Sequence, residues 1–426
     1  MLDLKFILKN PDLVAENSEK RNMPVSIDRV IALAAERSQK LQLLEEKRQA
    51  QNEIARKMKG PLADEERKSL VSEGAQLKST VAELEKELKD IEPALRDEQA
   101  RIPNLTHPEA PVGKGEHDNR ELRKSGHVPE FSFTPRDHGE LGKMLDILDF
   151  DNGTKVSGPK FYFLKGAGAL LEIALVNYAL QTLIREGFTP YITPDLAKSS
   201  VLFGTGFNPR GEETQIYSVA GSDLCLIATS EITLAGLLSD TILAEKDLPL
   251  RLAGYSHCFR TEAGTYGRAS KGLYRVHQFT KVEMFAYTVP EESDAMLEQL
   301  VGIEEKIFTG LGIPYRVVEC CTGDLGAAAY RKYDIEAWMP GREEGGTWGE
   351  VTSASNCSDY QARRLNIRYR PKGGKGAAHI HTLNGTAIAV SRALIAIMEN
   401  YQRSDGSVAV PEVLRPMVGK DELCPP

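Results

Sequence analysis

Hydrophobic positions between residues 28 and 101 recur with the spacing of two paired helices. In the second half of this stretch, apolar residues stand alternately four and three apart, at Leu77, Val81, Leu84, Leu88, Ile91 and Leu95. Such spacing keeps one apolar seam on the side of a helix that faces a partner helix. A weaker seam precedes it, at Ala34, Leu41, Leu44, Ala55 and Met58. We therefore predict an antiparallel helical hairpin, a coiled coil, in the N-terminal part of the chain.

Glycine and proline divide this stretch into two arms. Lys59-Gly60-Pro61 is a helix stop, and the acidic run Asp64-Glu65-Glu66 suits the first turn of a new helix. Each arm then has about 30–40 residues and is roughly 45–60 Å long, at about 1.5 Å per residue. Pro93 lies inside the second arm, where it should kink the helix or mark a local break.

Beyond residue 118 the pattern changes to that of a mixed domain. We predict a helix over 169–186 that ends at Gly187, a strand over 188–192, and helical spacing again over 386–402. Further strands are predicted at 255–262, 276–289, 315–320 and 347–353. Strands that cluster with few helices between them favour an antiparallel sheet. The predicted fold class is α+β, with the helical hairpin at 1–105, a linker rich in proline and glycine at 106–125, and a sheet domain flanked by helices at 126–426.

Composition is that of an ordinary globular protein. The 426 residues are 41% hydrophobic and carry 53 Lys+Arg against 61 Asp+Glu, a net charge of −8, which argues against extensive disorder. No stretch approaches the roughly 20 apolar residues that a bilayer crossing needs, so we expect no transmembrane helix. The N-terminus has an early acid and no long apolar core, so we expect no secretory signal. The six cysteines form no C-x-x-C pair, which predicts reduced thiols in a cytoplasmic protein.

The two arms of the hairpin differ in charge. Residues 29–59 hold eight Lys/Arg and four Glu, whereas the second arm is acidic. Two interpretations stay open: the charges keep the hairpin soluble, or the basic side of a protruding arm contacts a polyanion. The acidic total does not exclude a nucleic-acid partner, because the distribution of charge matters more than its sum.

Two neighbouring predicted strands carry charged and aromatic side chains with a spacing of two. Arg260 and Glu262 share one face of the first strand, and Phe279, Lys281 and Glu283 share one face of the second. The loop between the two strands is long and cationic. Spacing alone favours a salt-bridged sheet that faces solvent, because buried charges must be paired. The alternative interpretation, a functional site, stays open.

Four segments bear on that choice. They are F-R-T-E-A-G at 259–264 with H-Q-F-T-K-V-E at 277–283, G-F-T-P at 187–190 after the long helix, N-G-T-A-I-A-V-S-R at 384–392, and A-T-S-E at 228–231. The first resembles motif 2 of class II aminoacyl-tRNA synthetases, and its details are similar to those of the seryl-tRNA synthetases. The next three resemble motif 1, motif 3 and the T-x-E serine loop of that family. The N-terminal hairpin is similar to its tRNA-binding arm, so the resemblance covers nearly the whole chain in the expected order.

The resemblance implies an ATP-dependent, AMP-forming serine–tRNA ligase. Such an enzyme activates L-serine to seryl-adenylate and transfers it to the 3′ end of tRNA(Ser), and the family makes tRNA(Sec) a second candidate substrate. The resemblance further implies Mg²⁺, a homodimer formed through motif 1, no membrane partner, a tRNA-binding arm at 1–105 and a class II synthetase-like catalytic domain at 126–426.

The resemblance also assigns residues to ATP. Arg260 would hold the α-phosphate and the substrate carboxylate, and Arg260 and Arg392 would be the catalytic residues. Glu262 would accept from the adenine amino group, and Phe279 would stack on the adenine ring. Arg268 and Arg392 would hold the outer phosphates. The full set implied to bind ATP is Arg260, Thr261, Glu262, Arg268, Val276, Phe279, Glu350, Val351, Thr352, Ser353 and Arg392.

Serine and the metal ion receive residues in the same way. The set implied to bind L-serine is Thr229, Ser230, Glu231, Arg260, Glu283 and Thr386, with Glu283 and Thr386 near the substrate hydroxyl. Glu350 and Ser353 would supply oxygen ligands for Mg²⁺. Residues three apart do not share a face of a regular strand, so this pair requires a bulge or a turn.

Alternatives remain at two levels. Without their context, Thr229 and Thr386 are ordinary turn or strand hydroxyls, and the histidines are more typical of structural positions than of catalysts. A related ligase that loads a carrier protein, or an inert paralogue that acts as a coiled-coil scaffold, would share much of the pattern. The sequence contains no G-x-x-x-x-G-K-[ST] loop, no H-E-x-x-H motif and no comparable metal cluster.

Overall fold

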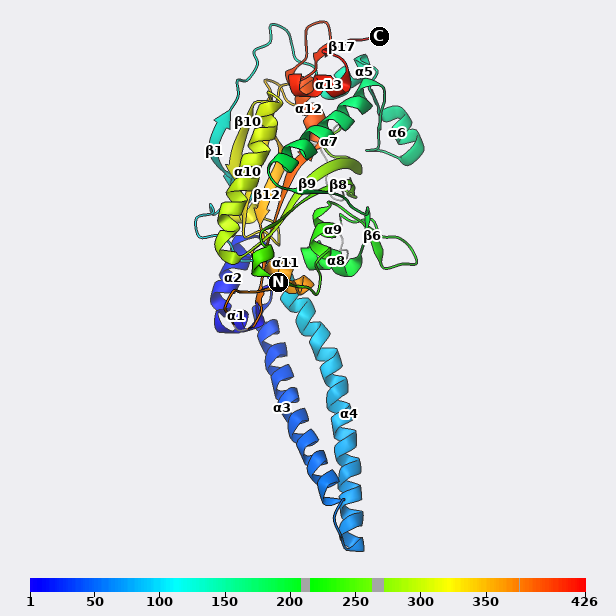
Figure 1. Cartoon of the computed structure of the whole chain (residues 1–426), viewed down its shortest axis with the longest axis vertical. Helices are drawn as coiled ribbons and strands as arrows, with labels where there is room; N and C mark the ends of the chain where they lie inside the picture. The colour runs from blue at the N-terminus through cyan, green and yellow to red at the C-terminus, as the bar shows by residue number, and fades with distance from the viewer. Residues whose placement is uncertain (208–214, 263–271, 375) are drawn as a thin grey trace. The chain divides into compact units, whose positions relative to one another are not determined.

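The computed structural model of the chain describes residues 1–207, 215–262, 272–374 and 376–426. These residues form two compact units, Met1–Leu105 and Thr106–Pro426. The first unit is helical, and the second is built around a large sheet (Figure 1). This confirms the predicted α+β class.

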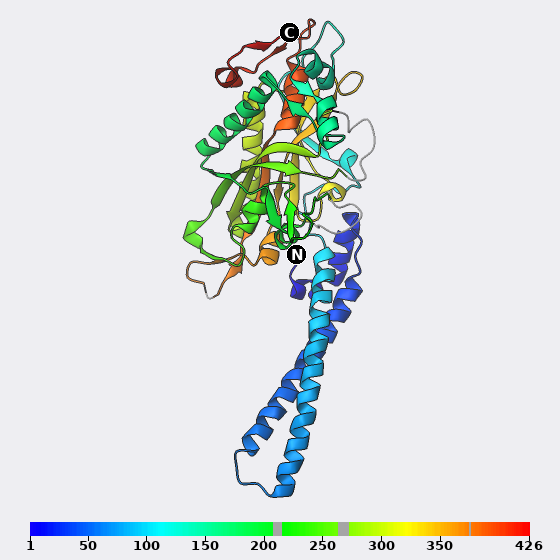
Figure 2. The same cartoon turned by 90° about the vertical axis from the view of Figure 1, so that its right-hand side faces the viewer.

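The N-terminal unit contains the predicted hairpin. Two short helices, α1 (Leu4–Lys9) and α2 (Pro11–Lys20), precede the arms, α3 (Ile27–Lys57) and α4 (Asp64–Arg101). The arms run in opposite directions from one turn (Figure 1 and Figure 2). The first arm ends and the second begins where the glycine, the proline and the acidic run predict. Helix α4 continues through Pro93, so the predicted alternative of a local break is wrong.

The seam between the arms is apolar in its centre and charged at its margins. Leu44 packs against Leu84 and Leu88 in one buried cluster, as the heptad pattern predicts. Ala55 is exposed and its neighbour Ile54 is partly buried, so the weaker seam was misplaced by one residue at this position. Basic residues of the first arm pair with acids of the second arm, in Arg37–Glu92, Lys40–Glu87 and Arg48–Glu85 at 2.9, 2.6 and 2.7 Å. Part of the basic charge of the first arm is therefore balanced within the hairpin.

The second unit contains an eight-stranded sheet in the order β1-β10-β11-β12-β15-β9-β8-β4. In that order the strands are Arg120–Ser125, Tyr315–Glu319, Arg331–Met339, Thr347–Asn356, His381–Ala389, Gln278–Thr288, Leu250–Phe259 and Thr189–Ile192. All neighbours pair antiparallel except β4, which runs parallel to β8. The predicted antiparallel sheet is thus confirmed. Strand β1 belongs to this sheet although it falls within the stretch predicted as linker.

Three long helices cover one face of the sheet: α7 (Ala167–Arg185), α10 (Ser293–Gly310) and α12 (Val390–Asn400) (Figure 1). Their apolar sides enclose the main core, to which β9 contributes Val282 and Met284. Side chains alternate across a strand, so the odd-numbered residues of β9 point to the opposite face. There Phe285 and Tyr287 pack under helices α9 (Glu231–Gly236) and α11 (Tyr360–Leu365).

The remaining elements are short. The helices are α5 (His138–Met144), α6 (Phe150–Ser157), α8 (Ser199–Thr205) and α13 (Arg415–Val418), with 3-10 turns at Glu116–Asp118, Glu245–Asp247, Pro290–Glu292, Thr322–Asp324 and Glu412–Leu414. The strands are β2 (Leu148–Asp149), β3 (Phe163–Leu164), β5 (Leu196–Lys198), β6 (Leu224–Leu226), β7 (Ile242–Ala244), β13 (Arg368–Arg370), β14 (Ala378–His379), β16 (Val408–Ala409) and β17 (Glu422–Leu423).

Two of the predicted boundaries that were wrong lie beside the candidate site. Strand β8 ends at Phe259, so Arg260 and Glu262 lie beyond it, and Glu262 has a positive φ of 48°. Strand β15 continues to Ala389, so the helical segment begins at Val390 and not at 386. Pairing of residues 381–389 with β9 outweighs the helical spacing of those residues.

Helix α7 contradicts the expectation that no stretch is long and apolar enough to cross a bilayer. Among the described residues it meets that measure of length and composition, with 39% of its most apolar stretch buried. Packing accounts for part of its apolar character, because Leu171, Leu175 and Leu183 are buried in the main core. Leu170 and Ile173 on its other side are exposed.

Candidate active site

A cavity of about 230 Å³ opens on the face of the sheet opposite the three long helices. Strand β9 forms its floor with Phe279, Lys281 and Glu283, whose alternation points all three side chains toward it. The other lining residues come from β12, β15, the segments after α8 and before α9, the segments flanking β8 and β9, and the first turns of α9 and α12: Phe207, Thr229, Glu231, Arg260, Glu262, Tyr274, Arg275, Val276, Glu350, Val351, Thr352, Ser353, Asn384, Thr386, Ala389, Ser391 and Arg392.

Arg260 is held at the cavity although it lies past the end of β8. Its N–H donates to the carbonyl of His277 (3.0 Å), and the Nδ1–H of His277 donates to the carbonyl of Arg260 (3.0 Å). The first bond continues the backbone pairing of β8 and β9 by one residue, and the second adds a side-chain bond from His277 to the same backbone unit. The Arg260 guanidinium lies 5.3 Å from the centre of the Phe279 ring. His277 therefore braces the site, in agreement with the structural role predicted for it.

The segment Glu350–Ser353 contains the bulge that its predicted role requires. Ile335 pairs with Thr352 and Glu336 pairs with Glu350, which leaves Val351 as the extra residue of β12. The bulge brings Glu350 and Ser353, three apart in sequence, to the same cavity.

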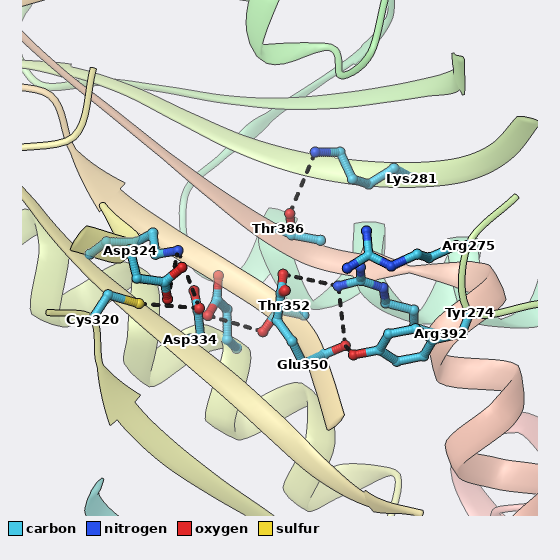
Figure 3. Close-up of polar contacts among 12 residues, drawn as sticks. Tyr274, Arg275, Lys281, Cys320, Asp324, Asp334, Glu350, Thr352, Thr386 and Arg392 are labelled. Carbon is cyan, nitrogen blue, oxygen red and sulfur yellow. Dashed lines mark hydrogen bonds and ion pairs between the residues drawn. The ribbon is translucent and has the colours of Figure 1, made fainter. Parts of the chain in front are cut away.

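Arg392 and Glu350 form an ion pair on the opposite wall (Figure 3). Arg392 Nη1 lies 2.9 Å from Glu350 Oε1, and its guanidinium lies 4.7 Å from the centre of the Tyr274 ring. Desolvation would raise the pKa of Glu350, but the charges of Arg392 and Lys332 hold that pKa below its usual range. The Glu350 carboxylate is therefore ionised, and Arg392 is fixed by contacts to two groups.

Glu231 is a buried acid at the inner end of the cavity. It begins α9, and its Oε1 accepts from the amides of Gln361 (2.7 Å) and Asn384 (3.0 Å). Burial, and then the charge of Glu283, raise its pKa to about 7. The hydroxyl of Thr229 accepts from the N–H of Glu231 (3.1 Å) and so fixes the turn into the helix.

Most of the predicted site residues meet at this cavity, and three need separate comment. Ser230 does not line it: its hydroxyl donates to the carbonyl of Gly254 (3.1 Å), pointing into the protein. Thr261 does not line it either, and its N–H donates to the carbonyl of Gln215 (3.2 Å). Arg268 lies outside the described residues.

Several lining residues were not predicted. Lys281 alternates with Phe279 and Glu283, and Asn384 opens the motif 3 segment, so both carried a signal in the sequence. Tyr274 and Arg275 precede β9 in a segment without periodicity. Their presence at the cavity depends on the tertiary structure.

One group of potential metal ligands was also missed. Cys320, Asp324 and Asp334 place ligand atoms within 4.8 Å of one another. The ammonium group of Lys332 lies 3.3 Å from Asp334 and 3.8 Å from Asp324. A protein cation therefore already balances these acids, which favours a structural role.

Two family models match the chain. The model of the seryl-tRNA synthetase N-terminal domain matches residues 1–106, and the model of the tRNA synthetase class II core domain (G, H, P, S and T) matches residues 216–401.

Curated and solved proteins resemble the chain along its whole length. Serine–tRNA ligases of Rubrobacter xylanophilus and Treponema denticola are 57% and 55% identical to it over 425 and 423 residues, covering 100% and 99% of this chain and 99% and 100% of theirs. The structure of seryl-tRNA synthetase from Pyrococcus horikoshii complexed with ATP has a TM-score of 0.92 at 42% identity, covering 100% of both chains. That of cytoplasmic serine–tRNA ligase from Naegleria fowleri in complex with AMP has a TM-score of 0.87 at 33% identity, covering 100% of this chain and 99% of that one.

Proposed function

This chain belongs to the seryl-tRNA synthetase family, and we propose that it activates L-serine with ATP to seryl-adenylate and transfers the seryl group to tRNA(Ser). One observation carries the proposal. A single cavity unites an arginine beside an aromatic ring, an Arg–carboxylate pair on the opposite wall and two buried glutamates at the inner end. The first two features suit a nucleoside triphosphate, and the third suits a small ammonium ligand.

The first step would need no nucleophile from the protein. The serine carboxylate attacks the α-phosphorus of ATP, the bond to the bridging oxygen breaks, and pyrophosphate leaves. Arg260 would hold the carboxylate and the α-phosphate together, since its planar fork neutralises charge that accumulates at phosphorus. In the second step the 3′-terminal ribose hydroxyl of the tRNA takes the acyl group and AMP leaves.

The nucleotide would lie along Phe279 and Arg392. The Phe279 ring would stack on adenine, with Glu262 accepting from the amino group, and Arg392 would hold an outer phosphate. Arg392 now pairs with Glu350, so ATP would bind a cation that is already in place. Such preorganisation costs no rearrangement when charge develops.

The side chains at the bulge in β12 carry the type of ligand atom that Mg²⁺ prefers. The Glu350 carboxylate and the Ser353 hydroxyl are oxygen donors at the cavity, as this hard cation prefers. We propose that they hold the ion. When bound, it would neutralise part of the charge on the phosphates of ATP.

Serine would occupy the inner end. Its ammonium group would approach Glu231 and Thr229, and its hydroxyl would approach Glu283 and Thr386. A buried acceptor rejects alanine strongly, because the acceptor would be left without a partner. Exclusion of threonine depends on steric closure against one methyl group, which discriminates less.

Two assays test the proposal. We expect serine-dependent exchange of pyrophosphate into ATP, followed by acylation of total tRNA. Exchange without acylation would favour a ligase that loads a carrier protein, and neither activity would favour an inert scaffold. The residues assigned to ATP and serine at the cavity support exchange followed by acylation.

The pH dependence of serine binding follows from Glu231. With a pKa of about 7, this carboxyl takes up a proton as the pH falls through neutrality and then attracts the serine ammonium group less. We expect the KM for serine in the exchange reaction to rise about tenfold from pH ~8 to pH ~6, with the KM for ATP nearly constant. Glu231→Gln should have a high KM throughout and lose this dependence. A KM for serine that is flat across this range would contradict the assignment.

The hairpin would bind the tRNA. Beyond the three cross-arm pairs, the basic residues near its tip make no ion pair with the described residues: Arg56, Lys57, Lys59, Arg67 and Lys68. Cations without a protein partner are available to phosphates. We propose this tip as a contact for tRNA(Ser), and tRNA(Sec) remains a second candidate substrate.

A second copy of the chain would cover the exposed side of α7. Leu170, Ile173 and Ile184 form an exposed apolar stripe on this helix, and Ile192 is 86% exposed on the neighbouring strand β4. Strand β4 ends the sheet, so its outer edge has no strand partner among the described residues. An apolar stripe beside an open edge is typical of an interface, which supports the proposed homodimer.

Charge placed on this surface should dissociate the dimer. We expect Ile173→Glu with Ile192→Glu to halve the mass measured by analytical ultracentrifugation at micromolar concentration, because two desolvated charges would face an apolar partner. Val71→Glu, at an exposed apolar position of α4, is the control and should leave the mass unchanged. A wild-type chain that sediments as a 47.0 kDa monomer would contradict the proposed dimer.

A further inference from the structure

The inner end of the cavity contains a buried lysine to which no role has yet been given. Lys281 is 5% exposed on β9, and its ammonium group lies 2.5 Å from Oε2 of Glu283. It also lies 3.5 Å from the hydroxyl of Thr386 on β15 (Figure 3). Burial of an ammonium group costs free energy unless the group is paired. The contacts to Glu283 and Thr386 therefore stabilise this lysine in its buried position.

The two glutamates at this end are held in the same manner. Oε1 of Glu231 accepts from two amide groups, those of Gln361 and Asn384. Oε2 of Glu283 accepts from Lys281 and from the Thr386 hydroxyl (3.2 Å). The second oxygen of each carboxylate has no hydrogen-bond donor among the residues that the structure describes. Each glutamate is thus fixed through one oxygen and offers the other.

The opposite side of Glu283 is equally constrained. Gly254 pairs with Glu283 across β8 and β9, and a Cβ at Gly254 would lie 2.5 Å from the hydroxyl oxygen of Ser230. The Ser230 side chain therefore fills the space beside the Gly254 backbone, next to Glu283. The orientation of the Glu283 carboxylate itself depends on its bonds to Lys281 and Thr386.

Charge balance gives Lys281 a second effect. Above about pH 7, where Glu231 is ionised, two carboxylates and one ammonium group leave this end of the cavity with one net negative charge, which a single substrate ammonium group would balance. The charge of Lys281 lowers the pKa of Glu231 against the opposing effect of Glu283, so without Lys281 the Glu231 carboxyl would bind a proton at a higher pH. The lysine thus keeps the charge matched to an α-amino ligand.

We propose that Lys281 is a positioning residue of the serine subsite: with Thr386 it holds Oε2 of Glu283 and presents Oε1 to the substrate hydroxyl. The proposal rests on the proposed function, and it concerns affinity and selectivity for serine, not the handling of ATP. A fixed acceptor that alanine leaves unpaired would make the lysine a determinant of specificity.

Substitution of Lys281 tests this role, because it should change the KM for serine much more than the KM for ATP. In serine-dependent pyrophosphate exchange we expect Lys281→Met to raise the KM for serine about 30-fold or more, with the KM for ATP within about threefold of wild type. The preference for serine over alanine should fall about tenfold or more. Lys281→Arg keeps the charge and should recover part of both losses. If the Met variant does not fold, Lys281→Gln tests the same loss of charge.

Lys124→Met is the control. Lys124 is also a lysine of a sheet strand paired with a carboxylate, that of Glu121 at 3.1 Å, but it does not line the cavity. We expect this variant to keep its KM for serine and its KM for ATP within about twofold of wild type. An unchanged KM for serine in Lys281→Met, or an equal rise in both KM values, would overturn the proposed role. A wild-type chain without serine-dependent exchange would instead contradict the proposed function itself, and the role of Lys281 with it.

Discussion

Replacing Arg260 by alanine is expected to abolish serine-dependent exchange of pyrophosphate into ATP, with a loss on the order of 10³-fold or more in kcat/KM. The guanidinium lies beside Phe279, and in the proposed mechanism its planar fork holds both the serine carboxylate and the α-phosphate. No other described arginine lies over the Phe279 ring. Arg260→Lys keeps the charge without the fork and should recover a small part of the activity.

The fold should survive this change. The Arg260 side chain is partly exposed and makes no ion pair with the described residues, and the two bonds to His277 use its backbone. The melting temperature of Arg260→Ala should therefore stay close to that of wild type. Arg123→Ala removes a surface arginine paired with Glu305 and controls for loss of a surface charge. Exchange by Arg260→Ala within tenfold of wild type would contradict the role assigned to this side chain.

Shortening the helical hairpin should separate the two steps of the reaction. We expect a chain in which residues 46–83 are replaced by a short Gly-Ser turn to exchange pyrophosphate at the wild-type rate. Its kcat/KM for charging tRNA should fall on the order of 100-fold or more, because contacts to the phosphate backbone would be lost. Leu44, Leu84 and Leu88 remain to close the shortened hairpin. The apolar cluster at its base also remains, with Ile27, Val30, Ile91 and Leu95.

A charge variant of the full-length hairpin provides the matched test. Arg56→Glu with Lys57→Glu and Lys59→Glu keeps the length of both arms and reverses the charge at the tip. We expect it to weaken charging and to reduce the salt dependence of the KM for tRNA, with exchange unaffected. Normal charging of tRNA by the shortened chain would contradict the proposed role of the hairpin in tRNA binding. Normal charging by the charge variant would show that other parts of the arm make the contact.

The sequence determined those features that depend on local periodicity. Heptad spacing located the hairpin, and Gly60 and Pro61 located its turn. Alternation predicted that Phe279, Lys281 and Glu283 share a face. Both patterns are informative because side chains repeat every 3.6 residues in a helix and every two residues in a strand. This periodicity is a local property of each element and does not depend on the rest of the chain. The roles of individual residues came from the resemblance to a family, and periodicity did not supply them.

Tertiary structure decided what depends on pairing between distant segments. The bulge at Val351 exists because β12 pairs out of register with β11, and it brings Glu350 and Ser353 to one cavity. Arg260 reaches that cavity because His277 holds it past the end of its strand. Burial sets the raised pKa of Glu231, and an ion pair with Lys281 and a hydrogen bond from Thr386 of another strand hold Glu283. Register, desolvation and long-range contact are properties of the folded chain as a whole, so local spacing could not contain them.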